Sequence, residues 1–96
     1  MITNHSATRP ALGVLGGMGP LATVDFFGKI VAHTPAKSDQ EHMPILIRNV
    51  PQVPDRTAAW LAGSDAPWEP LLAGVRALEA AGVDAIAIPC NSAHLW

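Results

Sequence analysis

The chain has 96 residues, of which 49% are hydrophobic and 15% are charged, and its formal net charge is −2. This balance is typical of an ordinary globular domain and excludes a disordered or fibrous chain. Lysine and arginine are not clustered, which excludes the basic surface that binds nucleic acids or anionic membranes, so we expect a small-molecule partner.

Residues 1–10 are polar and are expected to form a flexible tail, because they lack the charged-then-apolar layout of a secretory signal. No stretch approaches the roughly 18 to 20 apolar residues of a membrane helix, so no membrane partner is expected. Cys90 is the one cysteine of the chain and cannot form an internal disulfide. A reducing cytoplasm is therefore the expected location.

The first predicted strand is the apolar run 11–15, which leads into the glycine-rich turn 16–20. Proline at the first helical position, followed by apolar residues at helical spacing, predicts a helix that begins at Pro20 and is stopped by Thr34-Pro35. The polar residues 36–43 are expected to form a loop. The predicted strand and the helix that follows it thus form a βα unit.

The segment 44–50 (PILIRNV) is β-branched and almost continuously apolar, which predicts a second strand covered on both faces. Two prolines make residues 51–56 a rigid loop, and a short helical stretch around 57–61 can follow. Ser64 or Asp65 can cap a second long helix.

That helix has apolar residues at helical spacing from Trp68 to Leu78, and Gly82 supplies the left-handed residue after its end. The segment 83–89 (VDAIAIP) is then a third strand, and residues 90–94 follow it directly. The order βαβαβ predicts an α/β fold, an open parallel sheet with flanking helices. Its ligands are expected beyond the carboxyl ends of the strands, where the loops 16–20, 51–56 and 90–94 would meet.

Four segments in order resemble the aspartate racemase branch of the aspartate/glutamate racemase family: LGGMGPLAT (15–23), TPAKSDQEH (34–42), PQVPDRT (51–57) and IPCNSAH (88–94). The resemblance implies two similar α/β domains that face a cleft, no pyridoxal phosphate or other cofactor, and a homodimer in full-length members. It further implies that each domain supplies one cysteine for Cα proton transfer. Residues 11–96 would then be a partial first domain, with the second domain absent and no activity expected from this chain alone.

The resemblance also assigns the site residues. It implies that Cys90 is a catalytic acid/base, and that the substrate is bound by Met18, Gln52, Arg56, Asn91 and Ser92. Position 92 is more often threonine in the family, and serine keeps the hydroxyl group.

Several side chains also have a structural interpretation. Met18 could pack in the core and Gln52 could lie on the surface, while His94 could act as a base toward Cys90 or support its loop. Residues 39–42 combine acidic side chains with a histidine, but solvated or capping roles are expected for them, and no metal is assigned.

The chemistry explains why a cysteine would be used here. Inversion at Cα requires one group that removes the proton and another that returns it on the opposite face. A thiol serves if its pKa is lowered, for example by a following helix N-terminus. Because residues 91–96 are too few to nucleate that helix, we expect Cys90 in this chain to titrate near its ordinary value of about 8.5.

Two other functions remain open from the sequence. Gly17, Gly19 and Ala22 fit a loose dinucleotide-binding fingerprint between a strand and a helix. However, the second strand ends in Arg48-Asn49 rather than in the acidic residue that binds a ribose. The chain could also be a non-catalytic remnant or an interaction module.

Overall fold

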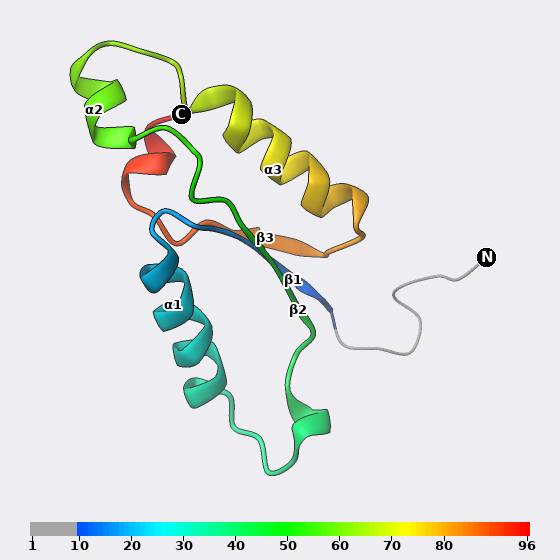
Figure 1. Cartoon of the computed structure of the whole chain (residues 1–96). Helices are drawn as coiled ribbons and strands as arrows, with labels where there is room; N and C mark the ends of the chain where they lie inside the picture. The colour runs from blue at the N-terminus through cyan, green and yellow to red at the C-terminus, as the bar shows by residue number, and fades with distance from the viewer. Residues whose placement is uncertain (1–9) are drawn as a thin grey trace.

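The computed structural model describes residues 10–96, so the tail predicted for residues 1–10 lies, except for Pro10, outside the described residues. Three parallel strands form one sheet in the order β2-β1-β3 (Figure 1). They are β1 (Leu12–Gly16), β2 (Ile45–Asn49) and β3 (Ala85–Ala87). In the register, Leu12 of the central strand lies opposite Ile45 of β2 and Ala85 of β3. The carboxyl ends of all three strands therefore point to the same edge.

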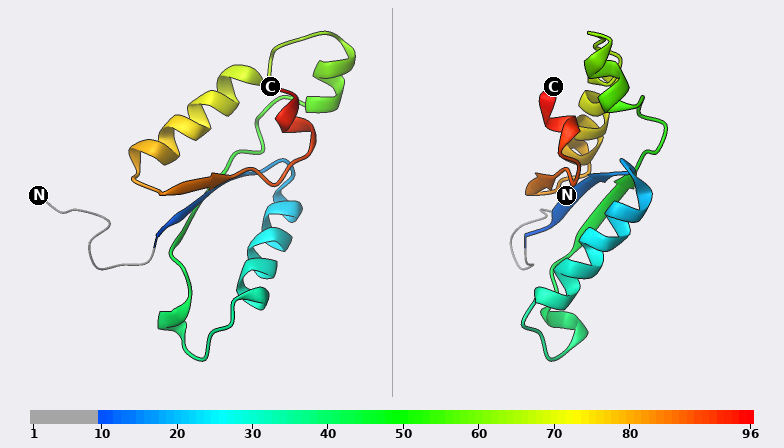
Figure 2. Two further views of the ribbon diagram at one scale, coloured as in Figure 1. Left: turned by 180° about the vertical axis from the view of Figure 1, so that it is seen from behind. Right: turned by 90° about the vertical axis from the view of Figure 1, so that its left-hand side faces the viewer.

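Helices lie on both faces of this sheet. Figure 2 shows α1 (Pro20–His33) on one face and α3 (Trp68–Ala80) on the other. The short α2 (Arg56–Leu61) and two single-turn 3₁₀ helices, η1 (Asp39–Glu41) and η2 (Ser92–Leu95), complete the described elements. The predicted open parallel sheet with flanking helices is confirmed. No helix in residues 10–96 is long and apolar enough to cross a membrane.

The ends of the two long helices follow the sequence signals. Pro20 occupies the first turn of α1, where its missing N–H leaves no hydrogen bond unmade. At the other end, the Thr34 hydroxyl donates to the Ile30 carbonyl at 2.6 Å, and Pro35 prevents further helix. After α3, Gly82 adopts a φ of +85°, which confirms it as the left-handed residue that ends the helix.

Two details differ from the sequence prediction. The α3 helix is not capped by Ser64 or Asp65: its N-cap is the buried Pro67, and the Ser64 hydroxyl instead accepts from the Ala66 N–H at 3.1 Å in the preceding turn. The β2 strand is not covered on both faces, since it is an edge strand and Leu46 remains 44% exposed. Apolar composition alone does not reveal which strand lies at the edge.

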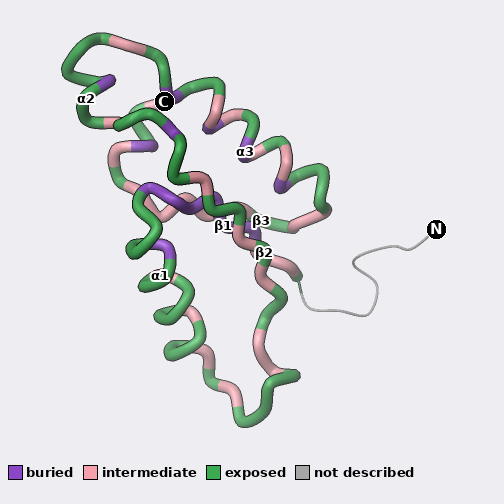
Figure 3. Tube along the Cα trace, in the orientation of Figure 1, coloured by how far each residue is buried: buried purple, intermediate pink, exposed green. Residues whose placement is uncertain are grey.

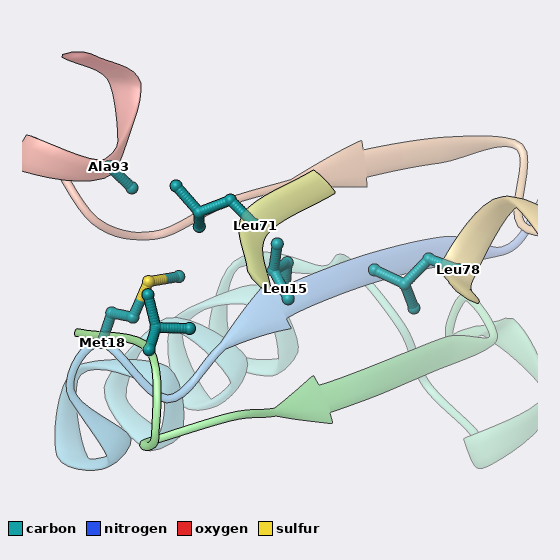
Figure 4. Packing of buried hydrophobic residues seen from close by; sticks show 6 residues of the cluster. Leu15, Met18, Leu71, Leu78 and Ala93 are labelled. Atoms are coloured by element: carbon teal, nitrogen blue, oxygen red, sulfur yellow. The ribbon is translucent and has the colours of Figure 1, made fainter. Parts of the chain in front are cut away.

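The hydrophobic core lies between α3 and the sheet, as Figures 3 and 4 show. It consists of Leu15, Met18, Val53, Leu71, Leu78 and Ala93, each at most 6% exposed. Gly74 allows α3 to approach β1 closely, because a Cβ atom there would lie 2.5 Å from Leu15 Cδ1. The α1 side is packed less completely, with Leu21 84% and Val24 66% exposed. The core therefore includes residues of the loops at the carboxyl edge of the sheet and holds these loops in place.

Candidate active site

The loop after β1 packs closely against the start of the loop that follows β2. Gly17 has a φ of +99°, and a Cβ atom at this position would lie 2.4 Å from the Val50 backbone nitrogen. The buried Thr23 hydroxyl accepts from the Gly17 N–H at 2.8 Å and donates to the Gly19 carbonyl at 3.2 Å. Thr23 lies in the segment 15–23 but is not among the site residues predicted from the sequence. These contacts fix the backbone on this side of the site.

The loop after β2 positions Arg56 at the start of α2. The Asp55 carboxylate caps this helix by accepting from the Ala58 N–H at 2.9 Å. Arg56 Nη1 donates to the carbonyl oxygens of Val53 and Pro54, at 3.3 and 3.4 Å. Arg56 Nε is buried and has no hydrogen-bond partner among the described residues. The guanidinium group is therefore fixed by its own loop and keeps donors available for another acceptor.

The loop after β3 carries the half-buried Cys90. Its backbone N–H donates to the Ile88 carbonyl at 2.8 Å, and its Sγ atom lies 3.6 Å from the Ser92 hydroxyl oxygen. The following turn, η2, packs against α2, where the rings of Trp60 and Trp96 meet edge to face with centroids 6.2 Å apart. In Figure 1 the C-terminal η2 accordingly lies between α2 and the loop after β1.

The electrostatic surroundings of Cys90 differ from the sequence expectation. Burial raises the pKa of the thiol. Hydrogen bonding by the Ser92 hydroxyl, the Ala93 backbone and Arg56, together with the positive charge of Arg56, lowers the pKa by more than burial raises it. The net pKa is below its ordinary value, so the prediction of an unshifted thiol was wrong. A single 3₁₀ turn suffices to bring Ser92 and Ala93 to the sulfur, and Arg56 comes from a different loop.

The structure brings Cys90, Arg56 and Ser92 together. Met18 belongs to the same core cluster against which Cys90 packs, and it is 5% exposed. Gln52 and Asn91 are exposed, and Asn91 makes no side-chain cap to η2. A role for these residues in substrate binding stays a prediction.

The acidic and histidine-containing segment 39–42 lies away from this site. The Glu41 side chain accepts from the backbone N–H groups of Lys37 and Ser38 and so forms a capping box for η1. The capping role expected for this segment is confirmed. Within residues 10–96, no group of three or more His, Cys, Asp or Glu side chains is arranged to hold a metal ion.

With this geometry in view, comparison with known proteins assigns the family. The family model described as Asp/Glu/Hydantoin racemase matches residues 15–96. The chain belongs to this family. The resemblance inferred from the sequence segments is thereby confirmed, and the nucleotide-binding alternative is not favoured.

Two relatives place the chain within the racemase family more closely. It is 33% identical over 91 residues to the broad specificity amino-acid racemase RacX of Bacillus subtilis (strain 168), a match that covers 88% of this chain and 38% of that protein. It also matches the structure of Picrophilus torridus aspartate racemase, with a TM-score of 0.86 and 39% identity over 92% of this chain and 38% of that one. The chain thus spans little more than a third of the length of these relatives.

Proposed function

We propose that this chain forms one side of a cofactor-independent amino-acid racemase site, in which Cys90 exchanges the Cα proton on one face of the substrate. The observation that carries the proposal is the lowered pKa of a half-buried thiol at the carboxyl edge of the sheet, next to Ser92 and Arg56. A lowered pKa increases the fraction of thiolate at neutral pH, and the thiolate is the form that acts as a base. A cysteine serving only to fill the core would not require these partners.

The proposed reaction has two proton transfers. The Cys90 thiolate takes the Cα proton, and the electron pair of the C–H bond remains on the substrate as a carbanion delocalised into its carboxylate. A second thiol from the other domain then donates a proton to the opposite face, which inverts the configuration. For the reverse direction the two sulfurs exchange roles.

Arg56 is proposed to bind the substrate carboxylate, because its fixed guanidinium group has donors left after its bonds to the loop carbonyls. The exposed amides of Gln52 and Asn91 and the hydroxyl of Ser92 are proposed to contact the rest of the substrate, with Met18 beneath them. The proposed substrates are aspartate, glutamate or similar amino acids. The complete protein is expected to be a cytoplasmic homodimer.

A chimera tests the proposal directly. Residues 15–96 would replace the matching segment of Picrophilus torridus aspartate racemase, and the purified protein would be assayed by chiral chromatography without added cofactor. We expect interconversion of L- and D-aspartate, and its loss in Cys90→Ser. Undiminished racemisation by the folded Cys90→Ser chimera would contradict the role of Cys90.

The chain by itself supplies a second test. Because it contains one cysteine, we expect no interconversion of the aspartate enantiomers by the isolated chain. Measurable interconversion, lost in Cys90→Ser, would contradict the assignment of the second proton transfer to another domain and would indicate a site assembled from copies of this chain.

A further inference from the structure

We propose that His94 is a positioning residue for Cys90, acting through a hydrogen bond that closes the turn around the thiol. The inference rests on the proposed function in that Cys90 is taken as the acid/base group. It concerns His94, which is not among the predicted site residues and whose role the sequence left open between a base and a support for the loop.

The hydrogen bonds of the turn carry this inference. His94 Nε2 lies 3.0 Å from the carbonyl oxygen of Ile88. A carbonyl oxygen only accepts, so Nε2 must carry the hydrogen and donate it. The same carbonyl accepts the Cys90 N–H at 2.8 Å. The Ile88 carbonyl oxygen thus links Cys90 to His94 at the far end of the turn. Its two lone pairs can accept both hydrogen bonds.

This closure fixes the thiol relative to the groups that bond it. Ser92 and Ala93 lie between Cys90 and His94 in the sequence, and both hydrogen-bond the sulfur. The His94 backbone N–H also donates to the Asn91 carbonyl at 3.3 Å, which makes the turn continuous. Without the imidazole bond, the backbone bonds of η2 would remain, but the far end of the turn would lose its link to the Ile88 carbonyl, so the Ser92 hydroxyl and the Ala93 N–H would be held less firmly against the sulfur.

His94 lies at the surface, so its role can be tested by substitution. The side chain is exposed, and it borders a cavity of about 260 Å³ whose other lining residues include Trp68, Leu71 and Trp96. An exposed side chain can be exchanged without leaving a hole in the core. Because His94 Nε2 donates its hydrogen to the Ile88 carbonyl, Nε2 does not serve as the base that takes the Cys90 proton.

The test compares variants of the isolated chain by the rate at which iodoacetamide alkylates Cys90 as a function of pH. In His94→Ala we expect the midpoint of the rate profile to move to higher pH, with the rate at neutral pH falling about tenfold for each unit of that displacement. His94→Gln should restore much of the wild-type profile, because the glutamine amide nitrogen occupies a position similar to Nε2. His94→Asn, whose amide corresponds to Nδ1, should resemble the alanine variant.

The matched control is His33→Ala, which removes an exposed histidine at the end of α1 and should leave the profile unchanged. A wild-type profile in folded His94→Ala would overturn the proposal, and so would equal displacement in the Ala and Gln variants, which would assign the effect to the ring rather than to its hydrogen bond. Since alkylation requires no substrate, these outcomes are independent of whether the chimera racemises aspartate.

Discussion

Arg56 and Cys90 follow different strands along the chain, yet the Arg56 guanidinium lies near the Cys90 thiol and joins Ser92 and Ala93 in lowering its pKa. The contact depends on the parallel sheet, which brings the carboxyl ends of β2 and β3 to one edge on either side of β1. It also depends on Asp55, which starts α2 where Arg56 can turn toward the third loop. The fold therefore adds the effect of Arg56 to that of the local turn, in which Ser92 and Ala93 already lower the pKa of the thiol.

The first prediction concerns Arg56. In Arg56→Gln the positive charge and the fork of donors are lost, so the pKa of Cys90 should rise and its alkylation at neutral pH should slow. Arg56→Lys keeps a charge but not the planar fork and should give an intermediate profile. Arg76→Gln, an exposed position on α3, is the control. Identical profiles for Arg56→Gln and wild type would show that the guanidinium does not act on the sulfur.

The second prediction separates the Ser92 hydroxyl from the backbone of the same turn. Ser92→Ala removes the group 3.6 Å from the sulfur, so the thiol pKa should rise. Ser92→Thr keeps the hydroxyl and should retain the wild-type alkylation profile. If alanine and threonine behave alike, the Ala93 N–H and Arg56 account for the lowered pKa without the hydroxyl.

Much of the fold could be predicted because its signals are local. The Gly-Pro turn before α1, the Thr-Pro sequence after it and Gly82 after α3 are conformational constraints that each residue carries with it. The position of Cys90 directly after the last strand could likewise be identified from the segment 88–94. The exposed face of β2 could not be predicted, because strand order decides which strand lies at the edge.

The lowered pKa of the thiol could not be predicted for a related reason. Sequence spacing gives the distance from Cys90 to Ser92, but not the distance to Arg56, which is set by the sheet. The start of α3 was misplaced because Pro67 is enclosed by the rest of the fold, whereas Ser64 and Asp65 offered only a local capping signal. At the start of α3, tertiary packing thus outweighed the local capping preference.

The third prediction tests the loop after β1. Gly17→Ala should destabilise the chain by about 1–3 kcal/mol, because a positive φ is strained for alanine and its Cβ would collide with the backbone at Val50. Gly28→Ala has open space around it in the middle of α1 and should stabilise by up to about 1 kcal/mol. Urea unfolding of both variants provides the comparison, and equal effects of the same sign would contradict the described backbone.

The fourth prediction concerns the core. Leu78 is 1% exposed, and Leu78→Ala should cost about 2–5 kcal/mol through lost burial and the cavity that remains. Leu61→Ala, at a position 80% exposed, should change stability by no more than about 0.5 kcal/mol. Similar urea midpoints for the two variants would show that α3 is not packed on the sheet as described.

The last prediction links the thiol to stability. The pKa of Cys90 is lower in the folded chain than its ordinary value, so at intermediate pH the unfolded chain binds more protons at this site than the folded chain does. The free energy of unfolding must then rise with pH in this window, and the contribution is complete above the ordinary thiol pKa and is lost as pH falls through the folded one. Cys90→Ser removes the titration, so the difference in unfolding free energy between wild type and this variant should grow with pH across that window and level off on either side. Subtracting the variant also cancels the titration of the histidines, which both proteins share. Urea unfolding under reducing conditions over a series of pH values measures the difference, and a flat or falling difference would mean that the folded environment does not favour the thiolate.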